Sequence, residues 1–243
     1  FGDIIIKKGR EKEVWETILE GVRGQGSGVS LLIPETRQLK PFLEFSFIRE
    51  DSPSFEVLKE LGGKIEEVDE APYLDLPKTW EEYLDSLDRH NRHELKRKMR
   101  KIENEDVQIV LSSSSVEDIQ ELFRLMELSS DEKKRFLSDK MKDFFQEIIF
   151  LFYKNKIAEL IFLRMEDINI AATLSFYYRD DVLLYNSGFD PKYGYLSAGL
   201  LLKAHLIKLA IEQKKKRFDF LRGNERYKYD LGGKKRKLYK FRF

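Results

Sequence analysis

Two segments in the second half of the chain carry residues that could do chemistry, and the first of them is rich in glycine. The segment GFDPKYGYLSAG places Gly188, Gly194 and Gly199 between a strand-like run and an apolar helix that starts near Ser197. Glycine lets backbone N–H groups approach a ligand closely, and a helix N-terminus offers unpaired donors and partial positive charge that suit a pyrophosphate. An ordinary strand–loop–helix turn uses the same residues, so the pattern leaves both interpretations open.

The second segment, RFDFLRGNERYKYDLGG, places charged residues and tyrosines directly after a short apolar strand. Functional groups often collect in loops that a rigid strand holds in place. A carboxylate such as Glu225 near a hydroxyl such as that of Tyr227 can serve as general base and general acid in the acylation of an amine. Composition alone favours the simpler interpretation, a charged surface loop with incidental ion pairs.

Residues that the chain lacks exclude several kinds of chemistry. The sequence contains no cysteine, which excludes disulfides, thiolate zinc sites and cysteine nucleophiles. His90 and His93 have i, i+3 spacing but no third ligand in view, so we expect no metal site. Neither a GxSxG elbow nor a P-loop occurs. Direct transfer between two bound substrates is the mechanism that remains for an enzyme of this composition.

The overall composition is that of a folded domain. Of the 243 residues, 42% are hydrophobic, and the formal net charge is +1 although 36% of residues are charged. The most apolar run, FFQEIIFLFY, is too short to span a bilayer. We therefore expect a cytoplasmic protein without a membrane span, and the start at Phe1 indicates a partial chain.

The first region of the chain alternates strands and helices, which predicts an α/β layer. In EDSPSFEVLKELGG, Ser52 can cap a helix, Pro53 suits its first turn and two glycines end it. The other elements expected in this region are strands at 3–7, 29–34 and YLDL, and a helix at 11–22.

The second region, residues 78–105, is expected to be one basic helix. Thr79 and Glu82 have the spacing of a capping box, and apolar residues recur at helical intervals. The run RHNRHELKRKMRK is either a solvated helix face, which is the commoner meaning of a charge run, or a basic edge that faces an anionic substrate or cofactor.

The third region, residues 106–243, is expected to combine a meander of antiparallel strands with helices. Its expected strands are VQIVL, the runs 157–165, 168–178 and 182–187, RFDFL and KLYKFRF. Its expected helices are 116–128, with Ser115 as N-cap, 139–153 and 197–213.

Three phrases give the chain its resemblance to a known family. They are YLDLPKTWEEYLDSLDRHNRHELKRKMRKIE, GFDPKYGYLSAGLLLKAHLIKLAIEQ and RFDFLRGNERYKYDLGG, and together they cover about Tyr73 to Phe243. In their order and spacing they resemble the GNAT-superfamily acetyltransferases of the CelD/BcsL-like group, which carry the BioF2-like acetyltransferase domain. That group is related to the Fem-type peptidyltransferases that build cell-wall cross-bridges.

The resemblance implies an α/β (α+β) fold with a GNAT-like, mixed and mostly antiparallel sheet, flanked by helices and splayed around the strand that ends near Ser187. Acyl-CoA would lie in the splay, with its pyrophosphate on the loop before the Ser197 helix. Residues 1–77 would be a partial, degenerate GNAT-like half, residues 78–105 a connecting basic helix, and residues 106–243 the acyltransferase domain.

The implied activity is direct transfer of an acyl group from acetyl-CoA or another acyl-CoA, without a metal, to an amine or hydroxyl. The acceptor would be a sugar, a polysaccharide precursor or another small molecule. Predicted catalytic residues are Glu225 as base, Tyr227 as acid and Arg222, which would orient substrate or a phosphate. Predicted cofactor-binding residues are Gly194, Tyr195, Ser197, Ala198 and Gly199. Predicted substrate-binding residues are Arg92, Asp219 and Lys228.

Two alternatives stay open. Asn224, Arg226 and Leu231 stand where Asp, Pro and Trp are common in the family, and YGYLSAG only approximates the GNAT phosphate loop Q/RxxGxG/A. These departures motivate a non-catalytic binding module that kept the fold. The basic helix and the basic tail, residues 234–242, motivate instead a Fem-type transferase of cell-wall synthesis, whose donor is an aminoacyl-tRNA. The sequence names neither the acceptor nor the oligomeric state.

Overall fold

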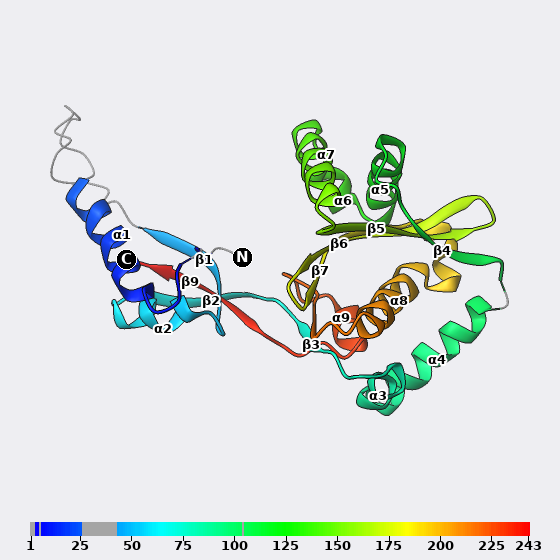
Figure 1. Cartoon of the computed structure of the whole chain (residues 1–243), viewed down its shortest axis with the longest axis horizontal. Helices are drawn as coiled ribbons and strands as arrows, with labels where there is room; N and C mark the ends of the chain where they lie inside the picture. The colour runs from blue at the N-terminus through cyan, green and yellow to red at the C-terminus, as the bar shows by residue number, and fades with distance from the viewer. Residues whose placement is uncertain (1–2, 5, 26–42, 104) are drawn as a thin grey trace. The chain divides into compact units, whose positions relative to one another are not determined.

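The structure of the chain is a computed structural model that describes residues 3–4, 6–25, 43–103 and 105–243 (Figure 1). The fold is mixed α/β, as predicted, with one antiparallel and one mixed sheet flanked by helices. The residues fall into two compact units. The first comprises Phe1–Ala71, Arg222–Asn224 and Lys235–Phe243, and the second comprises Pro72–Leu221 and Glu225–Lys234.

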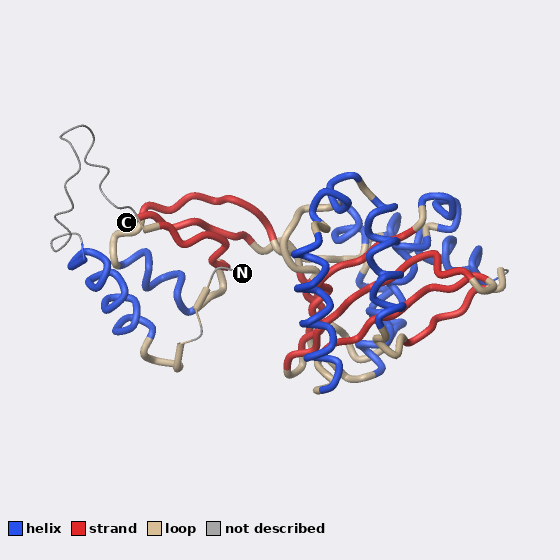
Figure 2. The backbone as a smooth tube through the Cα atoms, turned by 90° about the horizontal axis from the view of Figure 1, so that it is seen from above, coloured by secondary structure: helices blue, strands red, loops and turns tan. Residues whose placement is uncertain are grey.

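A three-stranded antiparallel sheet forms the centre of the first unit. Its order is β1-β9-β2, so the last strand of the chain lies between two early strands (Figures 1 and 2). The elements of the unit are α1 (Glu11–Gln25), β1 (Glu44–Arg49), α2 (Pro53–Glu60), β2 (Lys64–Glu70) and β9 (Lys237–Arg242). Its core consists of fully buried side chains from these elements: Trp15, Ile48, Leu58 and Phe241.

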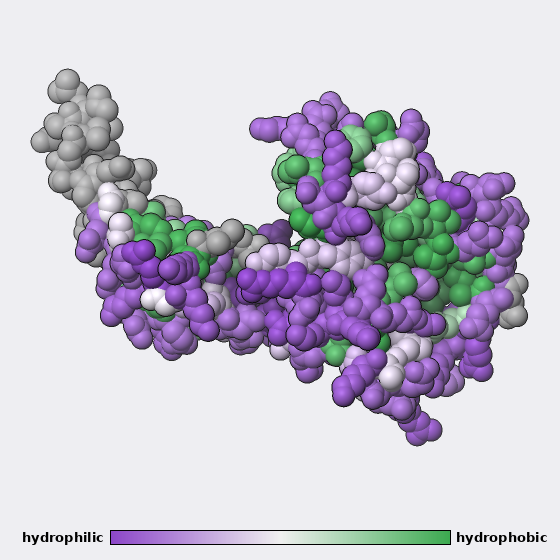
Figure 3. All heavy atoms as spheres, viewed as in Figure 1, coloured by the Kyte–Doolittle hydropathy of each residue, from purple (hydrophilic) through white to green (hydrophobic). Residues whose placement is uncertain are grey.

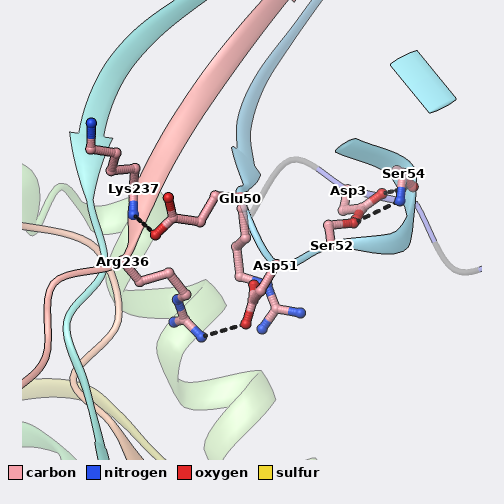
Figure 4. Close-up of polar contacts among 8 residues, drawn as sticks. Asp3, Glu50, Asp51, Ser52, Ser54, Arg236 and Lys237 are labelled. Atoms are coloured by element: carbon pink, nitrogen blue, oxygen red, sulfur yellow. Dashed lines mark hydrogen bonds and ion pairs between the residues drawn. The ribbon is translucent and has the colours of Figure 1, made fainter. Parts of the chain in front are cut away.

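Polar side chains hold the start of α2. Ser52 is the N-cap, as predicted, and its Oγ accepts a hydrogen bond from the N–H of Ser54 at 3.1 Å. The carboxylate of Asp3 accepts hydrogen bonds from the hydroxyls of both serines, which ties the segment before α1 to this helix (Figure 4). In the same unit, the buried guanidinium of Arg236 lies 3.7 Å from the carboxylate of Asp51.

Several features of the first unit differ from the prediction. Residues 3, 4, 6 and 7 are not part of a strand, and β1 and β2 were not predicted. In β2, charged residues interrupt the apolar alternation. The strand expected at 29–34 lies outside the described residues. The division into units also differs from the expected boundaries at 77 and 105, since β9 counts with the first unit. An alternating pattern identifies a strand but not its partners. The origin of this unit as a GNAT-like half stays a prediction.

The second unit contains a six-stranded mixed sheet with the order β3-β8-β7-β6-β5-β4. Neighbouring strands are antiparallel except β7 and β8, which are parallel. The strands are β3 (Tyr73–Asp75), β4 (Val107–Leu111), β5 (Ala158–Met165), β6 (Ile168–Tyr178), β7 (Asp181–Phe189) and β8 (Arg217–Asp219). The helices are α3 (Trp80–Ser86), α4 (Arg89–Glu103), α5 (Val116–Ser129), α6 (Asp131–Phe136), α7 (Asp139–Lys154), the 3₁₀ helix η1 (Pro191–Leu196), α8 (Ala198–Glu212) and α9 (Arg226–Asp230).

Helices cover both faces of this sheet (Figures 1 and 2). On one face, α5 and α7 contact β5, β6 and β7 around a core that includes Phe123, Phe145 and Phe162. On the other face, α8 contacts the same strands and buries apolar side chains such as Leu202 and Ile207. Because both faces are covered, the central strands are apolar on both sides, which explains their nearly continuous hydrophobic runs.

The region predicted as one basic helix over residues 78–105 forms two helices, so this prediction is wrong in part. Thr79 and Glu82 do form the predicted capping box at α3. The chain then becomes extended at Leu87, with φ −71° and ψ 147°, and α4 starts after it. Asp88 stabilises this second start because its carboxylate accepts from the N–H of Asn91 at 3.0 Å. The apolar spacing continues across the break and hid this N-cap signal.

The other long elements of the second unit are confirmed. They are β4, the meander β5–β7, α5 with Ser115 as its N-cap, α7 and α8, together with the short strands β3 and β8. The helices α6, η1 and α9 were not predicted, because five or six residues carry too little periodicity. Within the described residues, none of the helices combines the length and the apolar character needed to traverse a bilayer.

Replacement of Gly188 by alanine should destabilise the fold, because this part of β7 lies against the backbone of α5. A Cβ atom at Gly188 would lie 2.3 Å from the backbone N of Met126 and 2.4 Å from the backbone C of Leu125. We expect G188A to lower the free energy of unfolding by about 3 kcal/mol or more, as measured by urea denaturation. The control is G194A, whose new Cβ would meet nothing within 4 Å. Equal stability of the two variants would contradict this packing.

Candidate active site

The pairing of β7 with its two neighbours sets the geometry of the site. β6 pairs with β7 from Asp181 to Phe189, whereas β8 pairs only with Asp181–Leu183. Beyond Leu183, the edge of β7 that faces away from β6 therefore has no strand partner in the described part of the chain. This is the expected splay, although the strand continues to Phe189, past the predicted end near Ser187.

The predicted cofactor-binding residues form the turn between η1 and α8. Ser197 joins the two helices with a left-handed backbone, φ 55° and ψ 37°, and its side chain makes no capping hydrogen bond. The N–H groups of Ala198 and Gly199 have no acceptor among the described residues, so this turn can donate to an anion. Tyr195 is 54% exposed, and its carbonyl accepts from Nζ of Lys101 at 2.9 Å.

The two glycines of this turn lie in different surroundings. A Cβ at Gly199 would lie 3.1 Å from the ring of Phe189, so packing of α8 against β7 accounts for a glycine there. A Cβ at Gly194 would meet nothing within 4 Å, which leaves open space beside η1. Close approach of a phosphate to Gly194 therefore stays a prediction that the local space permits.

Glu225 and Lys228 lie together because the polar loop folds into α9, next to α8 (Figure 1). Nζ of Lys228 lies 2.9 Å from Oε2 of Glu225 and donates to the carbonyl of Leu221 at 3.2 Å. The side chain of Glu225 is 57% exposed, whereas that of Lys228 is 2% exposed. The pair thus presents a carboxylate to solvent above a buried ammonium group.

The protonation states of Glu225 and Tyr227 suit their predicted roles. Burial raises the pKa of Glu225, but the hydrogen bond from Lys228 and nearby positive charge lower it more, so its pKa lies below the usual value. Burial and the charge of Glu225 raise the pKa of Tyr227. At neutral pH, Glu225 is therefore ionised and can accept a proton, while Tyr227 keeps a hydroxyl that can donate one.

Two lysines that the sequence analysis did not select lie beside these residues. Lys203 on α8 is 6% exposed, lies with Nζ 4.7 Å from the ring centroid of Tyr227, and donates to the carbonyl of Gly199 at 3.0 Å. Burial, followed by the charge of Lys133, lowers the pKa of Lys203 to about 7. Lys133 on α6 donates to the carbonyl of Ser187 on β7, and burial lowers its pKa as well.

The sequence held a signal for one of these lysines. Lys203 stands three and four residues before Leu206 and Ile207, so it lies on the buried face of an apolar helix, where an ionisable residue is unusual. Lys133 lies in the short helix α6, whose sequence DEKKRF has no apolar face that would mark one lysine as buried.

The three other predicted residues have protein partners. Arg222 belongs to the first unit, where its guanidinium lies 4.5 Å from the ring centroid of Phe47. Asp219, at the end of β8, is 2% exposed, and its carboxylate accepts from the N–H of Leu221 at 2.8 Å. Arg92 on α4 donates to the carboxylate of Asp85 at 3.1 Å. These contacts give each residue a structural role, and their roles toward substrate stay predictions.

Two cavities flank α8, and neither is lined by a predicted catalytic or cofactor-binding residue. One of about 160 Å³ lies between α4, α8 and α9 and is lined by polar residues that include His90, Lys98 and Asp230. The other, of about 240 Å³, is mainly apolar and lies where hydrophobic side chains gather over β4 and α8 (Figure 3). In the described residues, no group of three or more His, Cys, Asp or Glu side chains is arranged to hold a metal ion.

Comparison with known proteins identifies a family and a fold. The acetyltransferase (GNAT) domain family matches residues 89–229, more than half of the 243-residue chain. No match was found among curated proteins.

Among solved structures, the crystal structure of FemX is similar over 94% of this chain and 76% of its own, at 12% identity and a TM-score of 0.65. The structure of L-PGS from Bacillus licheniformis is similar over 97% and 74%, at 13% identity and a TM-score of 0.63. A tandem GNAT protein from the clavulanic acid biosynthesis pathway is similar over 98% and 71%, at 11% identity and a TM-score of 0.52. At these identities the three structures support the fold alone.

Lys203 should make the stability of the fold depend on pH. Its pKa is about 7 in the folded chain against a usual value of 10.5, so the unfolded chain binds more protons between these two values. The free energy of unfolding should therefore rise as the pH rises from about 7 toward 10. The variant K203M should lack this rise and should exceed the parent chain in stability at pH 6 by a few kcal/mol, since one pKa unit corresponds to about 1.4 kcal/mol.

Urea denaturation between pH 6 and pH 9.5 measures this effect. The matched control is K208M, a partly exposed lysine of the same helix, which should keep the pH dependence of the parent chain. Parallel curves for the parent chain and K203M would contradict the burial of a titrating Lys203.

Proposed function

The chain belongs to the GNAT acetyltransferase family, and from this premise we propose that it transfers an acyl group from an acyl-CoA, in particular acetyl-CoA, to an amine or hydroxyl. One observation carries the proposal: the first turn of α8, with N–H groups that have no acceptor in the described residues, contacts β7, whose edge is unpaired beyond Leu183. A site for an anionic group thus adjoins a backbone edge along which an extended ligand can lie.

The first turn of α8 and the edge of β7 suit two parts of an acyl-CoA, its pyrophosphate and its acyl arm. The pyrophosphate would accept from the N–H groups of Ala198 and Gly199, with Gly194, Tyr195 and Ser197 around it. The acyl arm would follow the unpaired edge of β7. One carbonyl of that edge, on Ser187, already accepts from Lys133, so the arm would share the edge with this ammonium group. Bound there, the coenzyme would supply an activated acyl thioester.

Glu225 and Tyr227 would handle the protons of the transfer. Glu225 would accept the proton that the acceptor nitrogen loses as it is acylated, and Tyr227 would donate a proton to the leaving group. The lowered pKa of Glu225 makes it a weak base. Such a base suits a nitrogen that has become positively charged by forming its new bond. The predicted substrate-binding residues of the second unit, Arg92, Asp219 and Lys228, would orient the acceptor.

The acceptor and the subgroup follow from the sequence phrases. We propose that the chain belongs to the CelD/BcsL-like group and acts in the cytoplasm on a sugar, a polysaccharide precursor or a related small molecule. The family and the fold support transfer of an acyl group, and the acceptor rests on the resemblance of the three phrases to that group.

A second donor, an aminoacyl-tRNA, is favoured by the exposed basic side of α4, on which Arg89, Lys96, Arg97 and Arg100 lie. The basic tail fits this donor less well, since most of its cations have carboxylate partners within the first unit: Lys235 and Lys237 with Glu67, Lys240 with Glu66, and Arg242 with Glu44.

Titration with both candidate donors should distinguish these functions. Acetyl-CoA at 100 times its dissociation constant should add about 2.7 kcal/mol to the free energy of unfolding, which a thermal-shift assay detects readily. G194W should abolish this gain while keeping the fold, because the added side chain enters open space beside η1. Stabilisation by an aminoacyl-tRNA in place of any acyl-CoA would favour the second donor. No response to either would indicate a binding module without transferase activity.

The role of Glu225 can be tested with an acceptor for which transfer is detected. We expect E225Q to lower kcat by about 10²–10⁴-fold, the usual contribution of a general base, and also to lower thermal stability, because the buried Lys228 loses its charged partner. The matched control is E147Q, which alters an exposed carboxylate on α7. A kcat for E225Q equal to that of E147Q would remove Glu225 as the base.

A further inference from the structure

Three lysines from three helices of the second unit converge beside the proposed site, and we call them the lysine cluster: Lys133 on α6, Lys203 on α8 and Lys228 on α9. Lys203 and Lys228 are 6% and 1% exposed, and Lys133 is partly buried. Lys133 and Lys228 both lower the pKa of Lys203, in addition to the larger effect of burial, so the three charges lie within electrostatic reach of one another. Burying several like charges is unfavourable, and apolar residues would fill the same space at lower free energy.

The carboxylate of Glu225 acts on each lysine of the cluster. Glu225 is paired with Lys228 at 2.9 Å and also acts on Lys133 and Lys203. The other acid that acts on Lys133 is Glu132, which is exposed and therefore well screened by solvent. Lys133 and Lys203 therefore share with Lys228 the carboxylate that acts on both of them.

Lys133 and Lys203 also have more hydrogen-bond donors than protein acceptors. An ammonium group carries three N–H donors. In the described chain, Lys133 donates to the carbonyl of Ser187, and Lys203 donates to the carbonyl of Gly199 and faces the ring of Tyr227. The remaining N–H groups can donate to the oxygens of an anion, and such charge-assisted hydrogen bonds are among the strong ones.

The partners of the cluster locate it at the site of transfer. Ser187 lies on the unpaired edge of β7, and Gly199 lies in the first turn of α8. Glu225, the proposed base, is bound to Lys228. An anion held by the cluster would therefore lie beside the reacting groups and not on a remote surface.

We propose that the lysine cluster binds a carboxylate or phosphate group of the acceptor, so that the substrate is an anionic amine or alcohol. This narrows the acceptor to compounds such as amino acids, sugar phosphates or acidic sugars and disfavours neutral sugars. Assignment of the anion to the acceptor rests on the proposed function, whereas anion binding by the cluster does not.

Titration of the full chain with sulfate and with acetate, at pH 7.5 and constant ionic strength, tests the proposal. Sulfate represents a phosphate group and acetate a carboxylate, and tighter binding of one identifies which the acceptor carries. K133M should weaken the binding of that anion by about tenfold, the effect of losing a charged hydrogen bond. The matched control K134M, an exposed lysine of the same helix, should leave it unchanged. Equal affinities of K133M and K134M for both anions would overturn the proposal.

Proton uptake provides a measurement that needs no variant. An anion in the cluster should favour the charged form of Lys203, which is surrounded by Lys133, Lys228, Glu225 and Tyr227. Binding of sulfate at pH 7.5 should then take up protons, seen calorimetrically as a heat that changes with the ionisation enthalpy of the buffer. Absence of this uptake would overturn the part assigned to Lys203. Because no acyl donor is present, a failure to bind acetyl-CoA would contradict the proposed function and leave these results standing.

Discussion

Only three residue pairs join β7 to β8, whereas β6 pairs with β7 along its full length. Within the described residues, this difference leaves one edge of β7 without a strand partner beyond Leu183, at the end where the helical crossover through η1 and α8 begins. A crossover is required because β7 and β8 are parallel. The segments that carry the candidate chemistry follow β7 and β8 directly, so the length of this pairing decides which side chains meet. Gly188 and Gly199 let α5 and α8 pack closely against the same strand.

The positive charges of β9 in the first unit and those of the candidate site in the second unit lie in different surroundings. In the first unit, Lys237, Lys240 and Arg242 of β9 lie near carboxylates at the surface, where such pairs contribute little to stability. In the second unit, Lys203 and Lys228 are buried near the carboxylate of Glu225. Perturbed titratable groups of this kind are enriched at functional sites, because the same burial that lowers stability strengthens electrostatic contact with a ligand. Burial of these lysines at the candidate site therefore costs electrostatic free energy when the second unit folds.

Membership of the GNAT family indicates the class of reaction but does not identify the donor or the acceptor. One fold supports many substrates, so the likeness to FemX and L-PGS does not carry a donor to this chain. A coenzyme and an RNA make different physical demands on a protein surface. The coenzyme needs a compact group of hydrogen-bond donors and an extended edge, and we proposed the first turn of α8 and the edge of β7 for these roles. The RNA needs a broad basic surface, which the described structure offers mainly on α4.

The sequence by itself determined the elements whose signals are local. Capping at Ser52, Thr79 and Ser115, the meander and the long helix α8 follow from rules that act over a few residues. Only the tertiary structure decided that β9 pairs with β1 and β2, and that Lys133 and Lys203 join Lys228 beside Tyr227. Periodicity predicts which side of an element is buried, but the neighbours of a buried residue are set by strand pairing and helix packing between segments far apart in the chain.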